Sequence, residues 1–275
     1  MLSEVLKSVF LGIIEGVTEW LPVSSTGHML LVDEFLTLDA SDEFKRMFFI
    51  VIQLGAILAV TVLYFRRMLP IEFNSGLRIK KQTVSVWLKV AVACVPGAVV
   101  TLTAGDFVDS YLHTPQVIAF ALIFYGLVFI FVESRLRGKT LRVETLEEIS
   151  FRDAFIIGLF QVLSIIPGTS RSGATVIGAL LIGVPRVAAA EFTFFMAVPV
   201  MLGMSLIEVI RFGFNVTAGE AAILVSGAAT AFAVSLITVR WLIKYVSKKS
   251  FTVFGYYRIL LGAAVLIYFG ADIII

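Results

Sequence analysis

Leu21-Pro22-Val23-Ser24-Ser25-Thr26-Gly27 breaks an apolar region that runs from residue 8 to 38, and Ile166-Pro167-Gly168-Thr169-Ser170-Arg171-Ser172-Gly173 breaks a second one, from 154 to 185. A helix needs about 20 apolar residues to cross a bilayer, so each half of either region is too short. Irregular backbone at membrane depth is tolerated only inside protein or along a wet cavity. We therefore predict two re-entrant helical hairpins, 8–38 and 154–185, whose tips are buried in a helical bundle.

The composition is that of an integral membrane protein. Of the 275 residues, 59% are hydrophobic and 15% are charged, which does not describe an ordinary soluble domain. The formal net charge of +2 gives no basis for a nucleic-acid partner. Cys94 is the single cysteine, which excludes an internal disulfide. The N-terminal region lacks the pattern of a cleavable signal, so we expect the mature chain to begin at or near Met1.

Six further segments are long and apolar enough to span a membrane. They cover residues 47–65, 86–104, 116–132, 190–210, 221–243 and 256–274. The predicted fold class is therefore an all-α polytopic membrane protein with six transmembrane helices and two re-entrant helical hairpins.

An internal repeat links the two hairpins. An offset of 146 residues places Ser24 on Ser170, and the surrounding motifs align with them. We predict a single membrane domain, 1–275, built from a first repeat, 1–146, and a second repeat, 147–275. Each repeat holds one hairpin and three spans. Because three is an odd number of crossings, the second repeat is inverted relative to the first, an arrangement common in transporters.

Basic residues predict the orientation. Lys and Arg crowd the loops 66–85 and 135–152 and the turn 244–249, whereas the loop 105–115 contains neither. By the positive-inside rule the three basic segments are cytoplasmic. Both termini are then extracytoplasmic, and the two hairpins enter from opposite sides, the first from outside. Eight conventional spans are the alternative.

Four polar residues lie at or near membrane depth. They are Glu15, Glu19, His28 and Arg171. A charged side chain at mid-bilayer costs about 2.5 to 3.5 kcal/mol on insertion scales, so the charges are expected to face one another or water. Glu15 and Glu19 are one helical turn apart, and like charges so placed persist by holding a cation such as Mg²⁺ or by sharing a proton. A purely structural ion pair between the hairpins is the alternative.

The first break supplies hydroxyl groups at the start of a half-helix. Ser24, Ser25, Thr26 and Gly27 stand where unpaired N–H groups and the positive end of the helix dipole attract anions. Capping alone needs only one of these residues, and it does not account for His28. We interpret His28 as a proton-transfer group or as a donor to phosphate.

The second break resembles a phosphate cradle. Arg171 offers a guanidinium that binds oxyanions bidentately, while Gly173 admits close backbone approach. The hydroxyl groups that complete the shell belong to Ser170, Ser172 and Thr175. The alternative is that Arg171 extends to the membrane surface.

Together these residues indicate hydrolysis of a phosphate ester or anhydride. No Walker or kinase signature accompanies them, which leaves nucleotide-driven phosphoryl transfer unsupported. Gln53, in the middle of an apolar span, faces either the same site or a neighbouring helix.

The repeat also favours a transporter or flippase of an anionic lipid. A structural scaffold is a third interpretation, and it leaves the intramembrane charges unexplained.

The motifs 15–28 and 167–175, together with Val51-Ile52-Gln53-Leu54-Gly55, resemble the undecaprenyl pyrophosphate phosphatase family, the bacitracin-resistance type, over essentially the full chain. The resemblance implies that undecaprenyl diphosphate loses one phosphate and becomes the carrier for peptidoglycan synthesis. It also implies that the enzyme is stimulated by Mg²⁺ or Ca²⁺. The resemblance further implies a bacterial plasma-membrane enzyme whose site opens to the extracytoplasmic side. A raised level of such an enzyme confers bacitracin resistance. A flippase of polyprenyl phosphate is the alternative. The oligomeric state stays open, a homodimer included.

By motif position, Glu15 and Glu19 resemble the family's acidic pair, Ser25 its proposed nucleophile, His28 its histidine and Arg171 its phosphate-binding arginine. The family's neighbouring phosphate contacts match Ser170, Ser172 and Thr175. Our hypothesis is that Arg171, the N–H groups of the tips and a carboxylate-held Mg²⁺ neutralise the diphosphate. Ser25 then attacks the terminal phosphorus, and Glu19 or His28 accepts its proton. Direct attack by a metal-bound water is the alternative.

Overall fold

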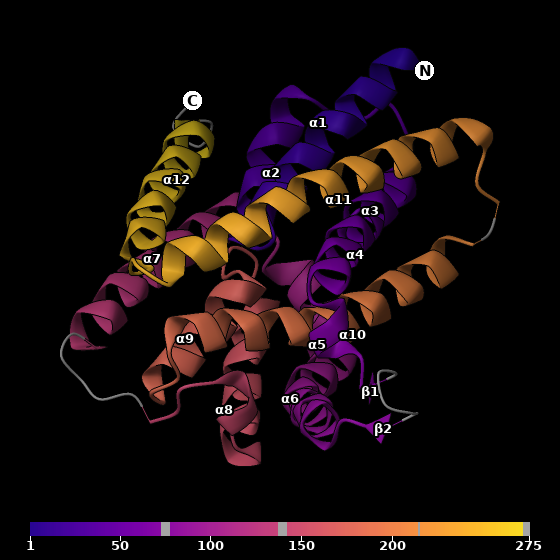
Figure 1. Ribbon diagram of the computed structural model, residues 1–275. Helices are drawn as coiled ribbons and strands as arrows, with labels where there is room; N and C mark the ends of the chain where they lie inside the picture. The colour runs from indigo at the N-terminus through magenta and orange to yellow at the C-terminus, as the bar shows by residue number, and fades with distance from the viewer. Residues whose placement is uncertain (73–77, 137–141, 214, 272–275) are drawn as a thin grey trace.

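The computed structural model describes residues 1–72, 78–136, 142–213 and 215–271, and this part of the chain is almost entirely helical (Figure 1). Its first half contains α1 (Leu2–Thr18), α2 (Ser25–Phe35), α3 (Asp42–Val51), α4 (Gln53–Leu63), α5 (Phe65–Met68), β1 (Ile71–Glu72), β2 (Arg78–Ile79), α6 (Lys81–Tyr111) and α7 (Pro115–Leu136). Its second half contains the 3-10 helix η1 (Leu146–Glu148), α8 (Phe151–Val162), the 3-10 helix η2 (Leu163–Ile165), α9 (Arg171–Leu181), α10 (Arg186–Phe212), α11 (Ala218–Val246) and α12 (Thr252–Ala271). The fold class is all-α as predicted, apart from the short antiparallel pair β1 and β2.

Six helical segments of the described residues are long and apolar enough to cross a membrane, which confirms the predicted number. They are Asp42–Leu63, Lys81–Gly105, Pro115–Leu136, Arg186–Phe212, Ala218–Val246 and Thr252–Phe269. The predicted loop 105–115 is wrong for most of its length, because α6 continues to Tyr111. A lone glycine such as Gly105 costs a helix only about 1 kcal/mol relative to alanine and does not by itself end it. The last predicted span, 256–274, reaches into residues 272–274, which lie outside the described part of the chain.

Both predicted breaks are present. α1 ends at Thr18 and α2 begins at Ser25, while η2 ends at Ile165 and α9 begins at Arg171. α2 and α9 are each 11 residues long, and α9 begins and ends 146 positions after α2. Each region is therefore two short helical pieces joined by a loop. The inversion of the second repeat, and the entry of the hairpins from opposite sides of a membrane, stay predictions.

Glycines let the broken helices pack closely against long ones. α1 packs along α11, and α8 packs along α6. A Cβ atom on Gly12 would lie 2.4 Å from the carbonyl oxygen of Gly227, and one on Gly158 would lie 2.3 Å from that of Ala93. Only glycine fits such close backbone contacts. Gly12 and Gly158 are separated by the same 146 residues as Ser24 and Ser170, so these two packing contacts share the offset of the two loops.

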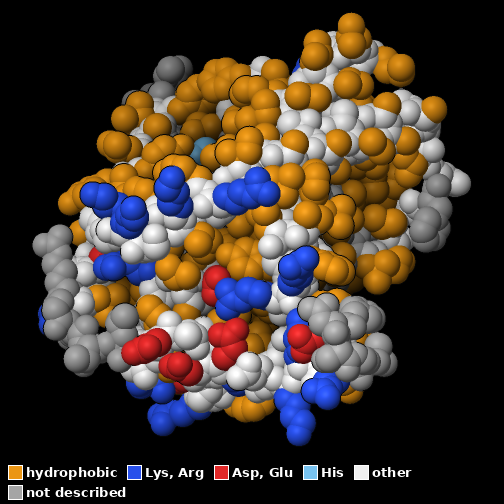
Figure 2. All heavy atoms as spheres, viewed as in Figure 1, with side chains coloured by type: hydrophobic (Ala, Val, Ile, Leu, Met, Phe, Trp, Pro, Cys, Tyr) orange, Lys and Arg blue, Asp and Glu red, His pale blue; other side chains and the backbone are white. Residues whose placement is uncertain are grey.

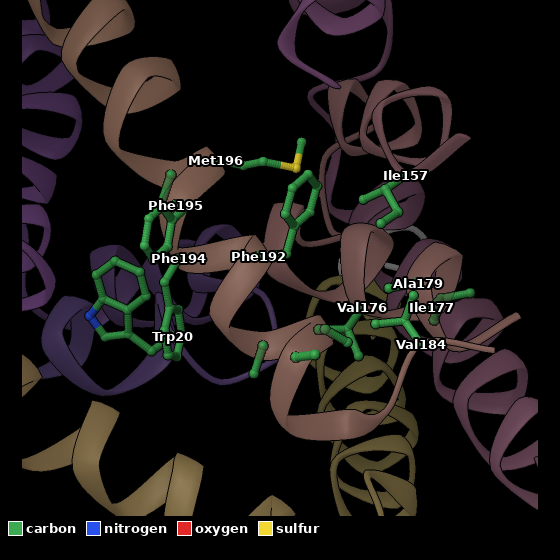
Figure 3. Close-up of a cluster of buried hydrophobic side chains, with 14 of the residues drawn as sticks. Trp20, Ile157, Val176, Ile177, Ala179, Val184, Phe192, Phe194, Phe195 and Met196 are labelled. Atoms are coloured by element: carbon green, nitrogen blue, oxygen red, sulfur yellow. The ribbon is translucent and has the colours of Figure 1, made fainter. Parts of the chain in front are cut away.

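The main hydrophobic core lies directly beside the first loop. Trp20 is 1% exposed and meets Phe194 edge to face, with ring centroids 5.2 Å apart. Figure 3 shows Trp20 next to Phe194 and Phe195 of α10, with Val176 and Ile177 of α9 in the same core. This packing holds the first loop against α10, in a core that also contains residues of α9.

The surface separates charged from apolar parts. Figure 2 shows basic and acidic side chains gathered over one part of the visible face, with hydrophobic side chains over much of the rest. Large exposed apolar residues such as Leu102, Phe120 and Leu260 lie on helices long enough to span a membrane. Such a surface is expected where helices contact lipid. In Figure 1 both termini lie at the top and β1 and β2 toward the bottom, which agrees with an even number of spans.

Candidate active site

Hydrogen bonds tie the two loops together. Ser172 Oγ of α9 donates to the carbonyl oxygen of Glu19 at 3.2 Å. Arg258 of α12, which is 0% exposed, donates to the carbonyl oxygen of Pro22 at 3.3 Å and to that of Gly168 at 2.8 Å. A guanidinium has enough N–H donors to bridge two chain segments in this way. The two loops therefore form one unit, although about 150 residues separate them in the sequence.

The charged residues of the two loops meet at Glu19. Arg171 Nη2 donates to Glu19 Oε1 at 3.0 Å, and Ser25 Oγ donates to Glu19 Oε2 at 3.2 Å. The side chains of Arg171 and Glu19 are only 12% and 8% exposed. Arg171 Nη1 also donates to the carbonyl oxygen of Thr193 at 3.3 Å. The structure thus brings Ser25 and Arg171 together at Glu19.

Glu15 lies one turn before Glu19 and is 1% exposed. Its Oε1 has no hydrogen-bond partner among the described residues. A buried, unpaired oxygen carries a desolvation cost of about 1 to 3 kcal/mol, more for a charged group, unless a shared proton or a cation satisfies it. Over the described ranges, no group of three or more His, Cys, Asp or Glu side chains could hold a metal. Two carboxylates can supply only part of the oxygen shell that Mg²⁺ takes, so a cation at Glu15 and Glu19 stays a prediction.

Ser24 and Ser170 hold the same unusual backbone conformation in the two loops. Their φ angles are 71° and 72°, and they are the only described non-glycine residues with positive φ. Each caps the helix that follows: Ser24 Oγ accepts from the Gly27 N–H at 3.4 Å, and Ser170 Oγ accepts from the Gly173 N–H at 3.1 Å. Such backbone costs about 1 to 3 kcal/mol and clusters at functional sites. It places Ser25 and Arg171 at the first position of α2 and α9.

The remaining predicted site residues differ in their contacts. Thr175 Oγ1 lies 2.8 Å from Thr193 Oγ1, which joins α9 to α10. Thr26 is exposed in the first turn of α2. Gln53 donates to the carbonyl oxygen of Phe49 at 3.4 Å, so its hydrogen bond is made within its own span and not to a neighbouring helix. No described contact joins Gln53 to the residues at Glu19, and its place at the site stays a prediction.

His28 turns toward α12. Its Nδ1 lies 2.7 Å from the carbonyl oxygen of Ser24, and its Nε2 lies 2.7 Å from the hydroxyl of Tyr257. Within the described part of the chain, no contact joins the ring to Ser25 or to either glutamate. The Ser25 hydroxyl therefore contacts Glu19 and not His28.

Arg258 and Tyr257 are the site residues that the sequence analysis missed. The insertion cost that marks Arg171 also applies to Arg258, since it lies in an apolar span, and it could have marked that residue. Tyr257 carried no such signal, because tyrosine is common near the ends of membrane helices.

Comparison with known proteins places the chain in a family. The family model for bacitracin resistance protein BacA matches residues 8–264, which include both loops. An undecaprenyl-diphosphatase of Enterococcus faecalis is 59% identical over 266 residues, 96% of each chain. An undecaprenyl-diphosphatase of Desulfitobacterium hafniense is 50% identical over 275 residues, 100% of this chain and 99% of the relative. Undecaprenyl-diphosphatase 1 of Clostridium acetobutylicum is 48% identical over 267 residues, 97% of each. The chain therefore belongs to the bacitracin resistance protein BacA family.

Proposed function

We propose that this protein removes the terminal phosphate of undecaprenyl diphosphate and leaves undecaprenyl phosphate. One observation carries the proposal: a candidate nucleophile, Ser25, and a phosphate-binding cation, Arg171, both contact the carboxylate of Glu19. Relatives named undecaprenyl-diphosphatase, which match nearly the whole chain, support this choice of substrate.

Charge balance explains how a diphosphate binds at these residues. Arg171 pairs with Glu19, so a bound diphosphate adds negative charge that this ion pair does not neutralise. Arg171 binds a phosphate bidentately once it leaves Glu19, and the first N–H groups of α2 and α9 attract the same anion. A divalent cation, Mg²⁺ or Ca²⁺, held by Glu15 and Glu19 supplies the remaining positive charge.

The chemistry starts at the Ser25 hydroxyl. When the phosphate takes up Arg171, Glu19 Oε1 is released, while Glu19 Oε2 keeps its contact with the Ser25 hydroxyl. Ser25 Oγ attacks the terminal phosphorus and gives its proton to Glu19 Oε2. The bond from that phosphorus to the bridging oxygen breaks, undecaprenyl phosphate leaves, and water hydrolyses the phosphoserine. Attack by water in place of Ser25, with Glu19 as the base, is the alternative.

Phosphate release by the purified protein tests the proposal. The protein in detergent, with no ion gradient and with Mg²⁺ or Ca²⁺ present, should release one phosphate per undecaprenyl diphosphate. A lipid flippase without hydrolytic activity would release none, and that outcome would refute the proposed function. Substrate labelled in its terminal phosphate should label Ser25, and near-normal turnover by Ser25→Ala would exclude the covalent route.

We further propose that the protein lies in the bacterial plasma membrane with this site toward the extracytoplasmic side. The basic loops 66–85 and 135–152 support this orientation. In a Cys94→Ala background, a Thr26→Cys variant should react with a membrane-impermeant thiol reagent in intact cells, since Thr26 is exposed. Reaction only in inside-out vesicles would contradict the orientation.

A further inference from the structure

Both nitrogens of His28 have hydrogen-bond partners, and the partners are unequal. The Ser24 carbonyl oxygen beside Nδ1 can only accept a hydrogen bond, so Nδ1 carries the proton. In the neutral ring Nε2 then holds the lone pair. The Tyr257 hydroxyl, 2.7 Å away, donates to it. The two contacts therefore specify one tautomer of His28.

Tyr257 is held in place by its neighbour in α12. Arg258 is fully buried and bonded to the carbonyl oxygens of Pro22 and Gly168, one in each loop. The Tyr257 backbone is thereby fixed relative to both loops. Its ring stacks on the imidazole, with centroids 5.6 Å apart and planes 8° from parallel. Stacking alone would not require the hydroxyl to lie at hydrogen-bond distance from Nε2.

We propose that Tyr257 is a positioning residue of the phosphatase site. It acts through His28: with the Ser24 carbonyl group it holds the imidazole in one orientation and in the Nδ1–H tautomer. It also occupies Nε2, the one ring atom that can accept a proton, while no substrate is bound. The catalytic part of this inference rests on the proposed function, whereas the tautomer rests on the contacts alone.

Nitrogen NMR tests the tautomer directly, because the chain has only two histidines, His28 and His113. Protein labelled with ¹⁵N-histidine is studied in detergent at about pH 8.5, some two units above the ordinary histidine pKa of about 6.5. A His113→Asn variant removes the second imidazole and assigns the signals. His28 should show a protonated Nδ1 and an unprotonated, hydrogen-bonded Nε2.

Tyr257→Phe removes the hydroxyl and keeps the ring. We expect its Nε2 signal to move toward that of an unbonded lone pair and its kcat/KM for undecaprenyl diphosphate to fall about fivefold, with little change in thermal stability. Tyr256→Phe is the matched control. Tyr256 is the adjacent residue and 57% exposed, and its hydroxyl has no hydrogen bond within the described ranges, so both readouts should stay at the wild-type value.

Either of two NMR results would overturn the proposal: a wild-type His28 protonated at Nε2, or a Tyr257→Phe variant with an unchanged Nε2 signal, whatever its activity. An unchanged kcat/KM in Tyr257→Phe would also overturn it, because the hydroxyl would then have no role in the reaction. If the tautomer is as expected but wild-type protein releases no phosphate, the proposed function fails and the tautomer assignment stands.

Discussion

Glu19→Gln removes one charge from the carboxylate at which both loops meet and leaves the shape of the side chain nearly unchanged. Glu19 accepts a hydrogen bond from Arg171 at 3.0 Å and one from Ser25 at 3.2 Å. The amide still has an oxygen for one of these donors, but it cannot serve as a base. The substitution therefore separates the role of the charge from the role of packing.

The expected magnitude follows from these two bonds. A hydrogen bond to a charged group contributes about 1.5 to 3 kcal/mol, against about 0.5 to 1.5 kcal/mol for a neutral one. Two weakened bonds should then lower the free energy of unfolding by about 2 kcal/mol. Loss of the base should lower kcat by about 10²- to 10⁴-fold.

Phosphate release from undecaprenyl diphosphate gives kcat, and thermal unfolding in detergent gives the stability. Glu191→Gln is the matched control, because Glu191 is 8% exposed and paired with Arg67. It makes the same chemical change at a buried carboxylate that lies outside the site, in an ion pair whose arginine is partly exposed. Its stability should fall by a similar amount while its kcat stays near the wild-type value.

Two outcomes would refute the reasoning about Glu19. One is a Glu19→Gln variant that keeps more than about a tenth of the wild-type kcat, since a base is worth at least about 10²-fold. The other is an equal loss of kcat in both variants, which would show that the effect comes from lost stability and not from the chemistry of Glu19.

Further substitutions test other parts of the site and fold. Arg258→Lys keeps the charge, but a lysine cannot bridge both loops. We expect kcat to fall about tenfold and the melting temperature to fall as well. Wild-type values of both would contradict the bridging role of Arg258. Gly158→Ala should lower the free energy of unfolding by about 1 to 3 kcal/mol, because its Cβ would lie 2.3 Å from a backbone oxygen. Gly203→Ala, with nothing within 4 Å of a Cβ, is the control and should cost no stability. A chelator should lower kcat in wild-type protein more than in Glu15→Gln; equal sensitivity would argue against a cation at Glu15.

The spans and the two breaks could be predicted because their signals are local. Hydropathy marks each span, and the Pro, Gly and Ser residues around Pro22 and around Gly168 mark the two breaks. The meeting of Glu19 with Arg171 could also be predicted, since neither charge can face lipid without a large cost. That argument identifies which charges must be satisfied. It does not identify the partner of each one.

The missed features depend on tertiary contacts. The sequence analysis gives His28 as an alternative proton acceptor for Ser25, yet its ring contacts the Ser24 carbonyl group and the Tyr257 hydroxyl. Glu191, near the start of the span Arg186–Phe212, is buried and paired with Arg67. Such pairings follow from how helices pack, and residue spacing along one chain does not encode them.

The central claim is that the two loops bind one diphosphate together. The most direct measurement is an experimentally determined structure of the protein with a methylene-bridged prenyl diphosphate, which cannot be hydrolysed at the bridge. The terminal phosphate should lie within about 3.5 Å of the Arg171 guanidinium, with its phosphorus facing Ser25 Oγ and Glu19 released from Arg171. A diphosphate bound elsewhere, with the Arg171 to Glu19 ion pair intact, would contradict the claim.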